Sequence, residues 1–218
     1  MIRRLFIAAA LAAALPFDAT ADDTVDEARE FVSGLADRVA AAAMRGPDAP
    51  RDEVRADFRS MLEDGFDVPV IAQFVIGRYW RGAEEADRAR FLELFESIIV
   101  ETYSNQIASF SGTGISVADA ERLNDKVVLV MTAIEREGSA EPFMLGWRVR
   151  TEGEMRIIDV VVEGVSLVQT QRSEYASVMR SEGGLAGLNA ALEEQLAKLA
   201  ADTGDAATTP EESADASG

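Results

Sequence analysis

Histidine and cysteine are both absent from the 218 residues of the chain. Without histidine the chain lacks the commonest general base and the usual partner of a nucleophilic serine, which excludes a Ser-His-Asp triad. The two missing residue types are also the main ligands of zinc sites, and without cysteine no disulfide can stabilise the fold. No phosphate-binding glycine motif is present. We therefore expect a protein that is not an enzyme and that uses no metal and no cofactor. Two distant carboxylates could still act as acid and base, but the sequence indicates no particular pair.

Positive charge is also scarce, since 21 lysines and arginines face 39 acidic residues and leave a net charge of -18. Such a chain is repelled by nucleic acid and by anionic membrane surfaces. We expect no nucleic-acid partner. Solubility alone accounts for the charge as well as a specific role does.

Long apolar runs are missing except near the N-terminus. Two arginines precede an uncharged apolar run at residues 5–15, and an A-x-A cleavage site ends at Ala21. This order is typical of a secretory signal peptide. The run is shorter than the roughly 20 apolar residues that cross a bilayer, and no cysteine follows the cleavage site to carry a lipid anchor. We predict a signal peptide over residues 1–21, cleaved after about Ala21, and a periplasmic mature protein.

Apolar residues at helical spacing predict helices on both sides of a β-rich segment. Thr24 with Glu27 resembles a capping box, and Asp67 and Ser166 are candidate N-caps of later helices. Residues 78–82 are predicted to be a connector. The expected helices cover about residues 24–44, 54–65, 67–77, 83–110, 165–182 and 185–200.

The β-rich segments are predicted at residues 115–121, 126–136, 143–150 and 155–163, joined by short links that favour antiparallel pairing. The fold class is therefore α+β, with a small antiparallel sheet of about four strands in a domain spanning residues 22–201. Residues 202–218 are acidic and lack large apolar side chains, which predicts a disordered tail.

The strands are apolar on both faces, where an antiparallel sheet with one wet face would alternate. In the second strand Leu129 and Met131 share one face, while Val128, Val130 and Ile134 share the other. Helices covering both faces would explain this pattern, and so would an apolar cavity against one face. Periodicity alone does not separate the two.

Two blocks of residues stand out by their order and spacing. They are Phe66-Asp67, Ile71-Ala72, Phe74, Ile76-Gly77-Arg78-Tyr79-Trp80-Arg81, Phe91, Phe95 and Tyr103 in the first block, and Ile158-Asp159-Val160, Glu163-Gly164-Val165-Ser166-Leu167-Val168 and Arg172 in the second. Both blocks resemble the MlaC-type periplasmic phospholipid-binding proteins, also called the toluene-tolerance substrate-binding family. The resemblance covers about residues 31–199. One departure is Met155-Arg156-Ile157, where the family often has Trp-Lys/Arg-Val, a difference that alters the implied cavity wall.

The resemblance implies a carrier with an apolar cavity between a curved sheet and packed helices, and we expect a monomer. The cavity would hold the acyl chains of a phospholipid, with the head group near the surface. The resemblance also implies partners. These are an outer-membrane lipoprotein complex and the periplasmic domain of an inner-membrane ABC transporter, between which the carrier would move lipid to maintain outer-membrane lipid asymmetry. Since a strongly acidic carrier avoids anionic membrane, the net charge favours docking on a basic patch of a partner.

Large apolar residues on the inner helix faces and on one sheet face are the candidates for the cavity wall, although ordinary core positions use the same side chains. Tyr79 and Trp80 are expected at the rim because their rings have a polar tip. We expect Arg78, Arg81 and Asp159 to form structural ion pairs, with a contact from either arginine to a lipid phosphate as the alternative. The candidate lipid-binding residues are Phe74, Tyr79, Trp80, Phe91, Phe95, Ile98, Leu129, Met131, Leu145, Trp147, Ile158, Val160 and Val162.

Two other functions remain open at this point. A protein of the same fold could carry a hopanoid or another polyprenoid lipid, in which case the mass of the extracted ligand would differ. A ligand-free periplasmic adaptor is the other alternative, and a core without a cavity would favour it.

Overall fold

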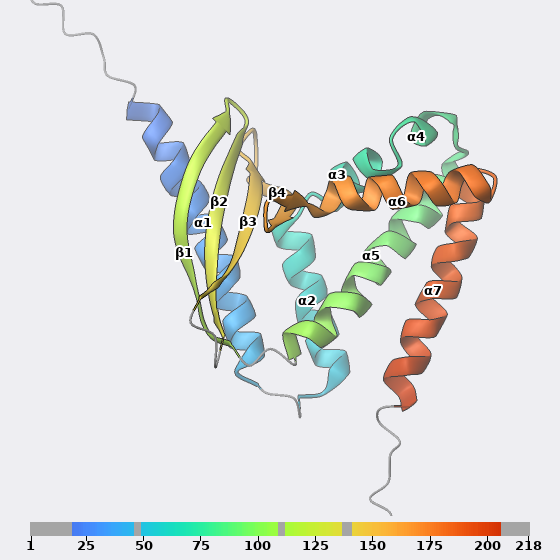
Figure 1. The fold of residues 1–218 in the computed structure, drawn as a ribbon, viewed down its shortest axis with the longest axis horizontal. Coiled ribbons are helices and arrows are strands. Elements are labelled where there is room, and N and C mark those ends of the chain that lie inside the picture. Colours follow the sequence, from blue (N-terminus) through green and yellow to red (C-terminus); the bar gives the residue numbers. More distant parts are fainter. Residues whose placement is uncertain (1–18, 46–48, 109–111, 137–140, 206–218) are drawn as a thin grey trace, which may run out of the picture.

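The computed structural model describes residues 19–45, 49–108, 112–136 and 141–205. Four helices precede a fifth, long helix, which leads into the sheet (Figure 1). Two more helices follow the sheet. In chain order the elements are α1 (Ala19–Ala43), α2 (Arg51–Gly65), α3 (Val68–Ile76), α4 (Arg78–Gly82), α5 (Glu85–Ala108), β1 (Gly112–Asn124), β2 (Val127–Arg136), β3 (Phe143–Arg150), β4 (Arg156–Val162), β5 (Val165–Ser166), α6 (Leu167–Ser181) and α7 (Leu185–Asp205).

The sheet has five strands in the order β1-β2-β3-β4-β5, and every neighbouring pair is antiparallel. The α+β class is confirmed, but the predicted strand number was one too low. The additional strand, β5, has only two residues and follows β4 after the two-residue turn Glu163-Gly164. Both turn residues have positive φ, 50° and 80°. A type I′ hairpin turn requires positive φ at both central positions.

Helix ends agree with the sequence at some positions and differ at others. Asp67 accepts a hydrogen bond from the backbone N–H of Val70, and Ser166 accepts one from Gln169, so both predicted N-caps are confirmed. The capping box at Thr24 is wrong, because α1 already begins at Ala19. Alanine is the strongest helix former and extends the helix into the preceding residues.

Two further boundaries were wrong. Residues 78–82 form the short helix α4 and not a connector. At the C-terminus α7 continues to Asp205, so residues 202–205 of the predicted tail are helical. The rest of that tail, residues 206–218, and residues 1–18 of the predicted signal peptide lie outside the described residues.

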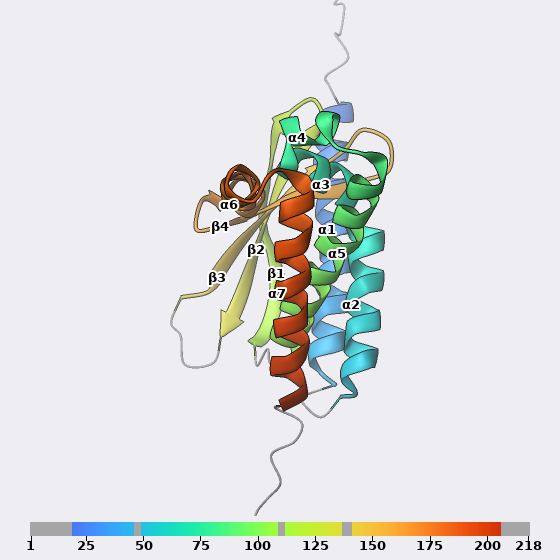
Figure 2. The same cartoon turned by 90° about the vertical axis from the view of Figure 1, so that its right-hand side faces the viewer.

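The helices lie mainly on one side of the sheet. Figure 2 shows the strands on one side of the molecule and α1, α2 and α5 on the other. Helix α1 packs along β1 and β2, whereas α3 and α6 meet the sheet at β4. Helix α6 runs from the end of the sheet toward α7, which packs on α5 (Figure 1).

The buried side chains form two clusters. The larger, called here the helical cluster, is built from the end of α2 and from α3, α5, α6 and α7, with Phe91, Leu94 and Leu188 at its centre. The smaller, called the sheet cluster, joins α1 to the strands through Val32, Val128 and Val149. Most single domains have one contiguous core. Phe66 is half-buried and packs against both clusters.

Within the described part of the chain, no helix combines the length and the apolar character that crossing a bilayer would require.

Candidate functional site

The register of the strands defines an inner face of the sheet, the face that α1 covers. Val128 and Val130 of β2 belong to the sheet cluster and lie on this face. Side chains that pair across strands share a face. The inner face therefore also carries Thr132 and Ile134 of β2, Leu145, Trp147 and Val149 of β3, and Val160 and Val162 of β4.

One end of the inner face is buried beyond the edge of the sheet cluster. Thr132 is 0% exposed and Ile134 is 9% exposed, and the apolar Ile134 belongs to neither hydrophobic cluster of the described residues. Leu145 and Val162 pair beside them and are half-buried. We call the inner-face residues Thr132, Ile134, Leu145, Trp147, Val160 and Val162, together with Phe66, the seam, because Phe66 packs against both clusters and its ring meets Trp147 on this face.

Trp147 and Phe66 mark the end of the seam nearest the helices. Their ring centroids are 6.4 Å apart, with the rings edge to face at 73°. The indole N–H of Trp147 donates to Oγ1 of Thr132 at 2.9 Å, and that hydroxyl donates to the carbonyl of Leu145 at 3.4 Å. The two polar side-chain groups on this stretch of the inner face, the Thr132 hydroxyl and the Trp147 indole N–H, are thus hydrogen-bonded. The remaining surface of the seam is apolar.

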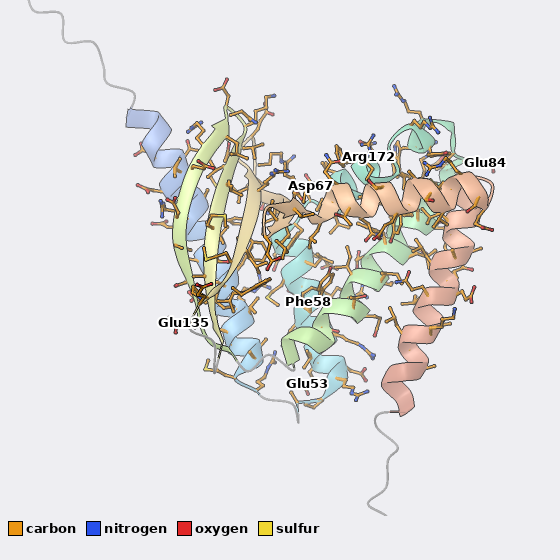
Figure 3. The ribbon with its side chains drawn as sticks, in the orientation of Figure 1. Glu53, Phe58, Asp67, Glu84, Glu135 and Arg172 are labelled. Atoms are coloured by element: carbon orange, nitrogen blue, oxygen red, sulfur yellow. The ribbon has the colours of Figure 1, made fainter. Side chains whose placement is uncertain are left out.

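Polar contacts join the helical body to the sheet at β3 and β4. The backbone N–H of Asp67 donates to the carbonyl of Ile157 at 2.9 Å, and the Asp67 carboxylate pairs with Arg150 at 3.0 Å. Figure 3 shows Asp67 at this junction, where α3 begins beside the sheet. Asp159, 5% exposed, accepts from Arg148 at 2.8 Å and from the backbone N–H of Val168 at 3.2 Å, which holds the first turn of α6.

The strand register divides the predicted wall residues between the two faces. Leu145, Trp147, Val160 and Val162 lie on the inner face. Leu129 and Met131 lie on the outer face, where they flank Gly146, and their side chains come within 3.1 Å of the place where a Cβ of that glycine would stand. Leu129 and Met131 therefore do not share a surface with the other four residues.

Ile158 is displaced by an irregularity in β4. The register shifts between Arg148 and Val149, so that Val149 faces Ile157 while Arg148 faces Asp159. Ile158 is left without a cross-strand partner, and Ile157 is the residue that is buried, at 1% exposure. A bulge of this kind changes the alternation along a strand.

The candidates on α5 lie in the helical cluster. Phe91 and Phe95 stack with centroids 5.5 Å apart, and both meet the ring of Tyr175 on α6 edge to face. Ile98 is 8% exposed in the same cluster. Burial among these rings raises the pKa of the Tyr175 hydroxyl well above its ordinary value.

The remaining candidates surround α3 and α4. Tyr79 and Trp80 are half-buried at the margin of the helical cluster, whereas Phe74 is 41% exposed. The predicted ion pair of Asp159 is present, with Arg148. Arg78 and Arg81 form no ion pair among the described residues. Arg78 instead lies over the ring of Tyr79.

Surface hollows occur away from the seam. One of about 470 Å³ lies between the start of α5 and the α6–α7 turn, and its lining includes Arg78, Glu84 and Asp87. Another of about 330 Å³ lies between α1 and α2 and includes Arg38, Arg45 and Asp57. Their charged linings do not suit an acyl chain. Among the described residues, no three potential metal ligands lie close enough together to hold an ion.

Sequence reasoning did not identify Phe66 and Thr132 as seam residues. The signal for Thr132 was present, since it is the one hydroxyl in an otherwise apolar strand, but its partner Trp147 is fixed only by the register. The role of Phe66 depends on its isolated parallel bridge to Ile157, which joins residues far apart in the sequence.

Comparison with known proteins identifies the family. The model of the MlaC protein family matches residues 34–194. The chain belongs to the MlaC family. A curated relative is the intermembrane phospholipid transport system binding protein MlaC of Haemophilus influenzae, 23% identical over 114 residues, which are 50% of this chain and 53% of the relative. The match thus spans about half the length of that relative.

A solved structure shows the same fold. It is the phospholipid-binding protein from Ralstonia solanacearum in complex with a phospholipid, 24% identical in sequence. The superposition has a TM-score of 0.70 and covers 79% of this chain and 98% of the other. The MlaC-family fold is therefore shared across nearly the whole length of that protein.

Proposed function

We propose that this MlaC-family chain is a periplasmic carrier that binds a phospholipid by its acyl chains and passes it between the two membranes. Family membership supports the ligand class, since the Haemophilus influenzae relative is named for phospholipid transport and the Ralstonia solanacearum protein was solved with a phospholipid. The proposed partners are the periplasmic domain of an inner-membrane ABC transporter and an outer-membrane lipoprotein complex.

The seam is the proposed place for the acyl chains, and the observation that carries this assignment is the division of the core into two clusters. The seam is mostly apolar, and its Thr132 and Ile134 are buried. Ile134 belongs to neither hydrophobic cluster of the described residues, although the seam residues Phe66, Trp147 and Val160 pack against the sheet cluster. Burying an acyl chain contributes roughly 0.8 kcal/mol per methylene. Contact with the seam can therefore supply tight binding without a charged clamp. Leu145, Trp147, Val160 and Val162 are the proposed contacts.

The other sequence candidates have different roles in this proposal. Phe91, Phe95 and Ile98 support the wall from within the helical cluster. Leu129 and Met131 are on the outer face and are proposed to have no lipid contact.

Native mass spectrometry of mature protein purified without detergent, followed by organic extraction, tests the ligand. We expect added mass equal to one or more phospholipids. Added mass equal to a hopanoid would keep the fold and change the cargo. Protein that is purified without a bound lipid and that also takes up no phospholipid from vesicles would contradict the carrier proposal and favour a ligand-free adaptor.

The proposed location of the acyl chains on the seam is tested by substitutions at two adjacent positions of β3. Leu145→Glu places a carboxylate on the inner face, whereas Met144→Glu places one on the outer face, and both native side chains are half-buried. Because a buried charge is costly beside an acyl chain, we expect Leu145→Glu to lower the bound phospholipid per protein at least about tenfold, with Met144→Glu close to wild type. Equal loss in both folded variants, or loss in Met144→Glu alone, would show that the seam is not the site.

A further inference from the structure

The arginines around α4 differ from most others in the described part of the chain. Elsewhere arginines pair with carboxylates, for example Arg55 with Glu101 and Arg90 with Glu193. Arg78, Arg81 and Arg172 form no ion pair with a carboxylate among the described residues. In a chain with a net charge of -18, three arginines without a paired carboxylate on neighbouring elements are unexpected. Within the described part of the chain, the nearby Glu84 and Asp87 line a hollow with Arg78 without forming an ion pair with it.

Aromatic rings hold two of these guanidinium groups. Arg172 lies 4.6 Å from the ring centroid of Phe74 and donates to the Phe74 carbonyl at 2.9 Å. Arg78 lies 5.1 Å from the ring of Tyr79 and donates to its hydroxyl at 3.2 Å. Stacking fixes the orientation of a guanidinium group while keeping it charged and able to bind a carboxylate side by side. These two cations are therefore already ordered for a partner.

Exposed apolar side chains lie next to the cations. Val70 is 44% exposed and Phe74 is 41% exposed, and they are one helical turn apart on α3. We call Val70, Phe74, Arg78, Arg81 and Arg172 the arginine face. It lies on the side of the molecule where Figure 3 labels Arg172, and Glu84 stands beyond it at the start of α5.

We propose that the arginine face is a docking surface for an acidic surface of a partner protein. Arginine and aromatic residues are enriched at the energetic centres of protein interfaces. Since the rest of this chain is acidic, an acidic partner is repelled in other orientations and is steered to this one. Net charge alone favoured a basic partner, but net charge does not report where arginines without a paired carboxylate gather.

A membrane fits the arginine face less well than a protein does. Helices that lie in a bilayer interface present a broad apolar stripe. Here the apolar part consists of two side chains on the nine-residue helix α3, and the guanidinium group of Arg172 lies over the ring of one of them. A compact patch of this kind suits a protein surface with paired carboxylates.

The test uses a defined partner and so rests on the proposed function. Binding of the lipid-loaded, full-length mature chain to the purified periplasmic domain of the cognate transporter is measured by biolayer interferometry at 50 and 500 mM NaCl. The variant is Arg78→Glu with Arg81→Glu, since both side chains are exposed. The matched control is Lys126→Glu with Lys198→Glu, which makes the same change in net charge at exposed pairs elsewhere. Arg78→Gln with Arg81→Gln removes the two positive charges without reversing them and is therefore a milder change than the double glutamate variant.

We expect the double glutamate variant to weaken binding at 50 mM NaCl at least about tenfold, the glutamine variant to weaken it less, and the control to stay within about twofold. We also expect wild-type binding to weaken at 500 mM NaCl. The docking proposal would be overturned if the wild-type protein did not bind the transporter domain. It would also be overturned if the lysine control lost as much affinity as the double glutamate variant.

Two further readouts separate this inference from the carrier proposal. The double glutamate variant should retain its phospholipid in native mass spectrometry. Loss of lipid would mean that the arginines belong to the cargo site, which would overturn the docking role while leaving the carrier proposal intact. Flotation with phosphatidylglycerol vesicles that bind wild type but not the variant would assign the face to a membrane and overturn the protein partner.

Discussion

The hydroxyl of Thr132 gives the indole N–H of Trp147 a hydrogen-bond partner on an otherwise apolar stretch of the inner face. It accepts from the indole N–H of the half-buried Trp147 and donates to the carbonyl of Leu145, so that two polar groups on β3 find partners on β2. An unpaired buried donor costs about 1–3 kcal/mol. The hydroxyl therefore keeps the tryptophan ring in place without bringing water to the seam.

At the same scale, the sequence identified which residues are large and apolar but not which face each one takes. Apolar residues occupy both faces of β2 and β3, so the sequence does not distinguish Leu129 of β2 from Leu145 of β3. The strand register places them on opposite faces of the sheet. A one-residue shift exchanges the two faces of a strand. In β4 the register irregularity at Ile158 places Ile157 on the inner face in its stead, because the alternation of faces cannot be counted across a bulge.

Tyr175 supplies a prediction for alkaline pH. Burial raises the pKa of its hydroxyl above the ordinary value of 10.0, so the folded state holds the proton after the unfolded state has released it. The stabilisation by the neutral hydroxyl is fully present below pH 10 and is lost as the pH rises toward the folded pKa. We expect the stability of wild type relative to Tyr175→Phe to be constant up to about pH 9 and to fall by about 1.4 kcal/mol per pH unit above 10.

Urea unfolding of both proteins at several pH values between 7 and 11 measures this difference. A difference that stays constant to pH 11 would mean that Tyr175 is accessible to solvent and titrates normally.

Short elements were the hardest to predict at the scale of helices and strands. Local chemistry identified the caps at Asp67 and Ser166, because a cap depends on residues three positions apart. Helix α4 and strand β5 have five and two residues and depend on packing and pairing with distant segments. Periodicity is not measurable over so few residues.

The turn between β4 and β5 gives a prediction of increased stability. Glu163 has φ of 50°, a conformation that side chains with a Cβ rarely adopt, and it precedes Gly164 in a two-residue hairpin turn. Asparagine tolerates this conformation better and is preferred before glycine in type I′ turns. We expect Glu163→Asn to raise the free energy of unfolding by about 0.5–1 kcal/mol.

Urea unfolding at pH 7 checks the value. Glu163→Ala is the control, since it removes the same carboxylate without the preference for positive φ, and it should not be stabilising. An equal gain in both variants would assign the effect to the lost charge and not to the backbone.

Repulsion between like charges acts on the whole molecule. The net charge is -18, and many of the described ion pairs are between half-exposed or exposed side chains, which contribute little individually. Salt screens both the pairs and the general repulsion. Because the uncompensated negative charge exceeds what the pairs neutralise, we expect salt to stabilise the fold.

Thermal unfolding at 20 and 500 mM NaCl measures the balance, with sucrose of equal osmolality as the control. We expect an increase of about 1 kcal/mol, which corresponds to roughly 2–4 °C for a chain of this size. A decrease in melting temperature with salt would show that the ion pairs outweigh the repulsion.

The α+β class and most element positions were predictable because they depend on local patterns and on composition. The division of the core into two clusters was not, because it depends on which strand faces which helix. Phe66 joins the clusters through contacts with residues more than 80 positions away, including Trp147.

This division gives the proposed cargo a second role. A lipid lying in the seam would serve as part of the hydrophobic core, so each delivery would remove some of the carrier's own stability. The empty protein would then be the form most exposed to proteases. A partner that accepts the lipid would have to compensate for that loss while the two proteins remain in contact. The polar contacts of β3 and β4 with α3 and α6 would keep the sheet and the helices together until the next lipid arrives.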